Sequence, residues 1–120
     1  MDIDVYRSQV DAWLGQEVEV QIDRPLGSAR PRHPDMIYKV NYGYVLDFKA
    51  PDGDNQDAYL LGVDHPVKSY RGMVVAIIRR LDDNEDKLVV APKGMSFSSE
   101  AIEEAVAFQE RYFHHILIHM

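Results

Sequence analysis

The segment DGDNQD at residues 52–57 places three carboxylates, Asp52, Asp54 and Asp57, within six residues and beside a glycine. Like charges at this spacing repel one another and raise each other's pKa, so the cluster is costly without a cation. A divalent cation with oxygen ligands removes that cost. The segment therefore predicts either a metal-binding loop or a solvated surface turn, since Asp, Gly and Asn also favour turns.

A second acidic segment, DDNED at residues 82–86, is followed directly by Lys87. It lies between two strongly apolar stretches and is interpretable as the polar tip of a hairpin. If this tip and residues 52–57 converge at one barrel mouth, their carboxylates would form a site for more than one cation. Adjacent metal ions of this kind clamp a phosphoryl group and activate a water molecule.

The segment NYGY at residues 41–44 combines two tyrosines with a glycine inside an apolar stretch. A glycine inside a strand predicts a bulge or a close approach of another backbone. At least one of the two tyrosines is expected in the core, and the other is a candidate for a functional role.

Five apolar strand patterns separated by turns should position these loops. In the first of them, Val18, Val20 and Ile22 alternate with polar residues, as in a half-buried strand. A short helix is predicted near residues 5–14, and a second helix, capped by Ser98 or Ser99, is predicted to run to about residue 115. We predict a mainly β (α+β) fold, a small five-stranded OB-like barrel with a C-terminal helix packed beside it, as one domain over residues 1–120. The strand patterns cover residues 17–22, 38–45, 58–63, 73–78 and 87–91.

The sequence is compatible with more than one role for each of two further segments. Residues 24–35 are rich in Pro, Gly and Arg and are predicted to form a loop, either a plain surface loop or one whose Arg30 and Arg32 contact an anion. His115 and His119 have a helical spacing that permits metal binding, although histidines near a helix end are also favourable as solvated groups.

The composition excludes several classes of protein. Among 120 residues, 20 are acidic and 13 basic, for a net charge of −7, which argues against binding to nucleic acid or an anionic membrane. There is no cysteine, so disulfides, thiolate zinc sites and cysteine nucleophiles are excluded. The first residues lack the features of a signal peptide, and no apolar run approaches the roughly 18 residues that span a bilayer. We therefore expect a cytoplasmic protein.

Taken in order, these motifs resemble the family I (soluble) inorganic pyrophosphatases over roughly residues 18–113. The resemblance is carried by Tyr38-x-Val-Asn-Tyr-Gly-Tyr, then Asp52-Gly-Asp-x-x-Asp, then Asp82 and the segment DKLVVAP that begins at Asp86. Ile22-Asp23-Arg24 and the helical segment FQERY that ends at Tyr112 are also similar to parts of that family.

The resemblance implies a function and a set of residue roles. It implies an inorganic diphosphatase that hydrolyses pyrophosphate or a small diphosphate with Mg²⁺, or Mn²⁺, as cofactor, and that forms a homo-oligomer. Asp54 would accept the proton of the attacking water. The implied metal ligands are Asp52, Asp57, Asp82 and Asp86, and the implied phosphate contacts are Arg24, Tyr42, Lys87 and Tyr112.

Departures from the family leave other functions open. The family has an N-terminal strand pair that bears a glutamate and a lysine of the site, whereas 23 residues precede Arg24 here, and Phe113 stands where the family has a lysine. One alternative is a catalytically weak module that binds metal and phosphate or a nucleotide in a regulatory role. Another is hydrolysis of an organic diphosphate.

Overall fold

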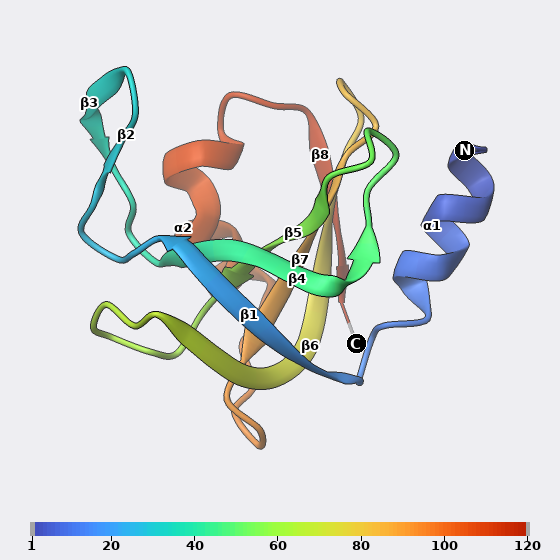
Figure 1. Cartoon of the computed structure of the whole chain (residues 1–120), viewed down its shortest axis with the longest axis horizontal. Coiled ribbons are helices and arrows are strands. Elements are labelled where there is room, and N and C mark those ends of the chain that lie inside the picture. Colours follow the sequence, from blue (N-terminus) through green and yellow to red (C-terminus); the bar gives the residue numbers. More distant parts are fainter. Residues whose placement is uncertain (1, 120) are drawn as a thin grey trace.

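Five strands close into a barrel in the computed structural model, which describes residues 2–119 (Figure 1). Around the barrel the order is β1-β4-β5-β7-β6 and back to β1, with every pair antiparallel except β5 and β7. This arrangement confirms the five-stranded barrel that the sequence predicts. The strands are β1 (Glu17–Arg24), β4 (Asn41–Lys49), β5 (Asn55–Leu60), β6 (Ser69–Arg80) and β7 (Asp86–Ala91).

The barrel closes because β6 is long enough to pair on both sides. Its first residues pair with β1, and the part from Met73 onward pairs with β7. The contact between β1 and β4 is tight at Gly43, where a Cβ atom would lie 1.8 Å from the backbone oxygen of Gln21. The backbones of β1 and β4 therefore approach closely at Gly43, as its place in the strand predicts. In this register, Tyr42 on β4 lies opposite Arg24 on β1.

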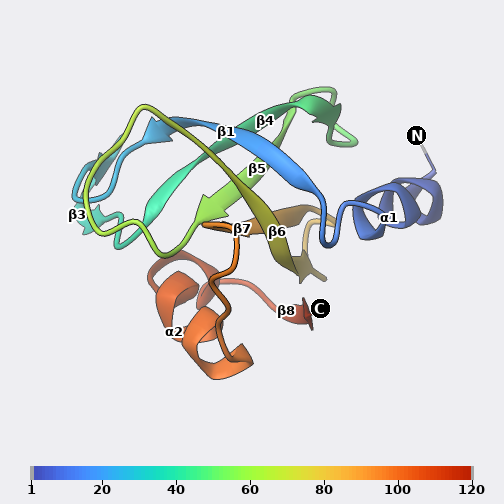
Figure 2. The same cartoon turned by 90° about the horizontal axis from the view of Figure 1, so that it is seen from below.

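Two helices pack on different sides of the barrel (Figure 2). The N-terminal helix α1 (Ile3–Asp11) begins where the Asp2 carboxylate accepts hydrogen bonds from backbone N–H groups, and its buried Tyr6 and Val10 join the barrel core. The C-terminal helix α2 (Ser99–Glu110) is capped by Ser98, as predicted. Its buried residues Ile102 and Val106 form a second core with the outer face of β5, β6 and β7. Within residues 2–119, no helix is both long and apolar enough to cross a membrane.

Two segments differ from the sequence predictions. The predicted loop at residues 24–35 contains β2 (Ala29–Arg30), which pairs with β3 (His33–Ile37) in a small hairpin that projects from the barrel (Figure 1). The predicted extension of the last helix to residue 115 is wrong, because α2 ends at Glu110 and β8 (His115–His119) pairs with β6. His115 and His119 therefore lie on a strand, not on one face of a helix.

Candidate functional site

A cavity of about 300 Å³ opens where β1 ends and the β2–β3 hairpin begins. We call it the arginine cavity, because three of its lining residues are arginines. The walls come from the barrel, the hairpin and the C-terminal end of α2. The lining residues are Asp23, Arg24, Arg30, Pro31, Tyr38, Tyr42, Asp57, Arg80, Gln109 and Phe113.

Two of the arginines leave positive charge available in this cavity. Within residues 2–119, no carboxylate lies within ion-pair distance of Arg30, and Arg24 has only a long contact of 3.9 Å between its Nη1 and Asp23 Oδ2. Burial raises the pKa of Tyr38, and the positive charges of Arg24 and Arg30 oppose that shift, so both guanidinium groups lie near its hydroxyl. The cavity is therefore suited to an anion with several oxygens.

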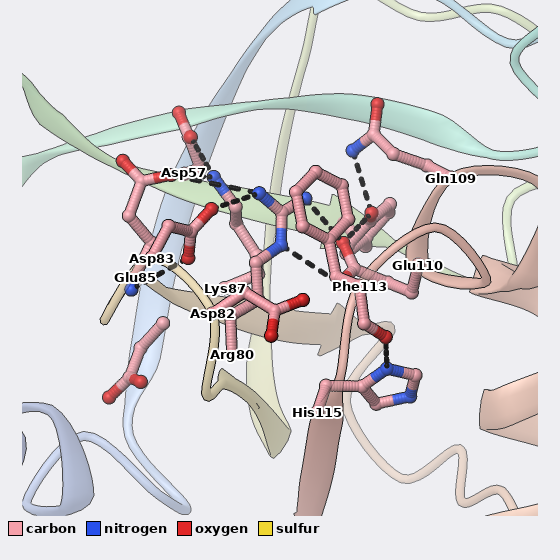
Figure 3. A network of polar contacts seen from close by, with 12 residues as sticks. Asp57, Arg80, Asp82, Asp83, Glu85, Lys87, Gln109, Glu110, Phe113 and His115 are labelled. Carbon is pink, nitrogen blue, oxygen red and sulfur yellow. Dashed lines mark hydrogen bonds and ion pairs between the residues drawn. The ribbon is translucent and has the colours of Figure 1, made fainter.

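Arg80 forms a rigid wall of the cavity (Figure 3). The residue is 5% exposed, and its Nε and Nη2 donate to Glu110 Oε1 at 2.9 Å and Oε2 at 2.7 Å. Its Nη1 also donates to Asp83 Oδ2 at 3.1 Å, and the guanidinium carbon lies 3.7 Å from the centre of the Phe113 ring. These contacts fix the orientation of Arg80, but they also neutralise much of its charge.

Lys87 and Asp57 form an ion pair beside the arginine cavity. The Lys87 Nζ donates to Asp57 Oδ2 at 2.5 Å and lies 3.5 Å from Glu85 Oε2. Asp86 and Lys87 are successive residues of β7, so their side chains face opposite sides of the strand. On its own side, Asp86 is buried and accepts a bidentate contact from Arg79.

A second cavity of about 240 Å³, which we call the carboxylate cavity, adjoins the first and shares Asp23 and Asp57 with it. Asp54 also lines it. Burial raises the pKa of Asp23, Arg24 opposes this shift, and the negative charge of Asp57 adds to it. A carboxylate whose pKa is raised by burial and by a neighbouring negative charge favours a nearby cation. The lining residues are Asp23, Tyr44, Asp54, Asn55 and Asp57.

The oxygen donors of the carboxylate cavity are of the kind that Mg²⁺ and Mn²⁺ prefer. Asp23, Asp54 and Asp57 could hold such an ion together. In this conformation, however, no three Asp, Glu or His side chains of residues 2–119 converge closely enough to do so. Binding by all three would therefore require at least one of them to move, and Asp54 is exposed on a bend.

Some of the residues predicted from the sequence meet at these cavities. Arg24, Tyr42 and Asp57 line the arginine cavity, Asp54 lines the carboxylate cavity, and Lys87 contacts Asp57. Burial raises the pKa of Tyr42 well above its usual range, and the neighbouring Asp57 charge raises it further. Tyr42 is thus held protonated, as a hydrogen-bond donor.

Four other predicted residues lie elsewhere. Asp52 is exposed and accepts a hydrogen bond from the Asp54 backbone, and Asp82 accepts one from the His114 backbone at 2.8 Å. Asp86 is held by Arg79, and Tyr112 is 63% exposed. Their roles as ligands or phosphate contacts stay predictions, and the structure does not bring them to the two cavities.

Three residues of the site, Asp23, Arg80 and Glu85, are not among the functional residues predicted from the sequence. Asp23 precedes Arg24 at the end of an alternating strand, which is a detectable signal for a residue at a barrel mouth. Glu85 stands just before β7, and the sequence does not indicate which carboxylate of this turn contacts Lys87. The position of Arg80 depends on contacts with Glu110 and Phe113, which are distant from it in the sequence. No local sequence pattern therefore indicates this position.

Comparison with known proteins identifies the fold. No protein-family model matches the chain, and no curated protein sequence matches it. Solved structures do match: the inorganic pyrophosphatase from Ehrlichia chaffeensis has a TM-score of 0.69 at 17% identity, covering 88% of this chain and 87% of that one. The enzyme from Thermus thermophilus matches with a TM-score of 0.64 at 16% identity, over 87% and 83% of the two chains. That from Coxiella burnetii matches with a TM-score of 0.63 at 20% identity, over 82% and 78%. The chain therefore has the fold of these enzymes, as its sequence motifs predict.

Proposed function

We propose that this protein, which shares the fold of bacterial inorganic pyrophosphatases, hydrolyses a phosphoanhydride with the help of a divalent cation, and that pyrophosphate is a substrate. The observation that carries the proposal is the direct contact of the two cavities. One is lined by arginines, the other by carboxylates, and Asp23 and Asp57 belong to both. A diphosphate bound by a metal ion needs this arrangement of an anion site beside a cation site.

The carboxylate cavity would hold the cation through Asp23 and Asp57, with Asp54 beside it. A bound Mg²⁺ or Mn²⁺ ion would neutralise part of the phosphate charge and would lower the pKa of a bound water molecule. Asp57 now contacts Lys87, and that contact would weaken as the carboxylate turned to the ion. The freed ammonium group of Lys87 could then contact a phosphate oxygen.

The other side chains would bind and orient the diphosphate. Arg24 and Arg30 would contact its oxygens with their guanidinium groups, and the protonated hydroxyl of Tyr42 would donate one further hydrogen bond. We assign the proton transfer to Asp54, whose carboxylate would accept a proton as water attacks phosphorus and the bridging P–O bond breaks. The products are two phosphates.

One observation favours a second candidate, a catalytically weak module that binds metal and phosphate. Two of the four cations near the site, Arg80 and Lys87, are paired with carboxylates of the chain itself. Fewer free cations remain to neutralise a strongly anionic transition state. Each lost charge-assisted contact removes on the order of 1.5–3 kcal/mol, or roughly one to two powers of ten in rate. We therefore expect slow turnover.

Phosphate release from pyrophosphate tests the proposal. We expect slow release that rises with Mg²⁺ concentration and stops when a chelator is added. Asp54→Asn should abolish release, whereas the control Asp47→Asn, at an exposed position of β4 outside both cavities, should leave it unchanged. Equal rates for wild type and Asp54→Asn would remove Asp54 as the proton acceptor. No release by any variant, together with measurable metal binding, would favour the binding module.

A further inference from the structure

A third cavity continues the site beyond the arginine cavity. It has a volume of about 290 Å³ and lies between the β2–β3 hairpin and the end of α2. We call it the hairpin cavity. It shares Arg30 with the arginine cavity, so this one side chain lies at the junction of the two. The lining residues are Arg30, His33, Asp35, Met36 and Tyr112.

The three cavities follow one another in a fixed order. The carboxylate cavity shares Asp23 and Asp57 with the arginine cavity, and the arginine cavity shares Arg30 with the hairpin cavity. An elongated ligand that lies along this path meets acidic side chains at one end, free guanidinium groups in the middle, and an aromatic ring at the other end. Inorganic pyrophosphate has no group that would use the third cavity.

The chemistry of the hairpin cavity suits a planar organic group. Tyr112 is 63% exposed. The Arg111 guanidinium carbon lies 5.1 Å from the centre of the Tyr112 ring and Arg111 Nη2 donates to the Tyr112 hydroxyl at 3.0 Å, so a flat ring would stack on the face away from Arg111. The Arg30 Nη1 lies 3.6 Å from the sulfur of Met36, which places an apolar side chain directly beside the junction. Asp35 can accept hydrogen bonds from N–H or O–H groups, and its negative charge disfavours a further phosphate there.

We propose that the site takes an organic diphosphate, specifically a nucleoside 5′-diphosphate, with its base or sugar in the hairpin cavity. The two phosphates would lie in the arginine cavity, the terminal one nearest to Asp57, and Arg30 would contact the phosphate that carries the nucleoside. This assignment of the substrate class rests on the proposed function. Water attacks the terminal phosphorus, the bond from that phosphorus to the bridging oxygen breaks, and one water proton passes to Asp54. The products are a nucleoside monophosphate and phosphate.

The test compares two ligands that share the same diphosphate geometry and resist hydrolysis. They are α,β-methylene-ADP and methylenediphosphonate, and the measurement is calorimetric binding to the full chain with Mg²⁺. We expect the nucleotide to bind at least about fivefold more tightly, which corresponds to one stacked ring. Tyr112→Ala should remove this preference, because it should weaken binding of the nucleotide more than binding of methylenediphosphonate. Tyr112→Phe should retain the preference, and Arg30→Gln should weaken both ligands.

Failure of the inference can be told apart from failure of the proposed function, except that binding of neither ligand would contradict both. Equal affinities of the wild type for the two ligands, or an equal loss for both in Tyr112→Ala, would overturn the inference, as would binding of neither ligand. Binding of these ligands requires no hydrolysis. A retained nucleotide preference without phosphate release from pyrophosphate would therefore contradict only the proposed catalytic function.

Discussion

Replacement of Glu110 by glutamine should strongly destabilise the fold. Glu110 is 0% exposed, and its carboxylate accepts two hydrogen bonds from Arg80 and one from the Tyr59 hydroxyl. In Glu110→Gln, the side-chain oxygen can keep one of the Arg80 contacts, while the new NH₂ group faces a guanidinium that also donates. The buried charge of Arg80 then keeps only Asp83 at 3.1 Å and Glu85 at 3.7 Å.

The size of the effect follows from these contacts. Loss of one charge-assisted hydrogen bond costs about 1.5–3 kcal/mol, and removal of one partner from a buried ion pair costs about 3–5 kcal/mol. We expect the free energy of unfolding to fall by about 3–5 kcal/mol. Because a domain of this size has a total stability of about 5–15 kcal/mol, the variant would be marginally folded.

Urea unfolding followed by circular dichroism measures this change. We expect the midpoint to fall by about 1.5–2.5 M, given a urea slope of about 2 kcal/mol per M. The control Glu104→Gln removes an exposed carboxylate of the same helix and should change stability by less than about 0.5 kcal/mol. The double variant Arg80→Met/Glu110→Leu, which removes both charges, should be far closer to wild type than Glu110→Gln. A loss below about 1 kcal/mol in Glu110→Gln would refute the view that this pair holds the cavity wall.

Three further predictions concern other contacts. Gly43→Ala should prevent stable folding or lower the melting temperature by many degrees, because its Cβ would lie 1.8 Å from Gln21 O; a near-normal melting temperature would contradict the close approach of β1 and β4. Asp57→Asn should lower metal-free stability by about 1–3 kcal/mol, because the buried Lys87 loses its nearest carboxylate; unchanged urea unfolding would show that the ion pair adds nothing. Burial lowers the pKa of His115, but hydrogen bonds with Glu103 and with the Phe113 carbonyl raise it above 6.5 overall. Its contribution to stability should therefore be fully present below pH 6.5 and disappear as the pH rises through the folded-state pKa. The difference in melting temperature between wild type and Glu103→Gln should accordingly be larger at about pH 6 than at about pH 8.5, and a constant difference would contradict the ion pair.

The barrel was predictable because its signals are local. Alternation in residues 17–22 and the apolar run at residues 73–78 each specify a strand without knowledge of its partner. The end of the chain was not predictable in this way. The short apolar segment at residues 116–118 suits either a helix or a strand, and only its pairing with β6 decides between them.

The candidate site was predictable only in part, because it depends on which way side chains face. The resemblance to the pyrophosphatases implies both Asp57 and Asp86 as metal ligands. In the barrel, Asp57 faces Lys87, whereas Asp86 faces Arg79 on the opposite side of β7. Strand alternation within β7 places Asp86 and Lys87 on opposite faces, and so separates Asp86 from Asp57. The position of Arg80, by contrast, follows from packing against α2 and could not be seen in the sequence.

The most direct test of the proposed metal site is a crystal structure of the protein with Mn²⁺ and methylenediphosphonate, with the metal located by its anomalous scattering. We predict an anomalous peak in the carboxylate cavity, within ligand distance of oxygens from at least two of Asp23, Asp54 and Asp57, with the diphosphonate beside Arg24 and Arg30. A peak at Asp82 or Asp86 instead, or the diphosphonate bound without any metal at Asp57, would contradict the account.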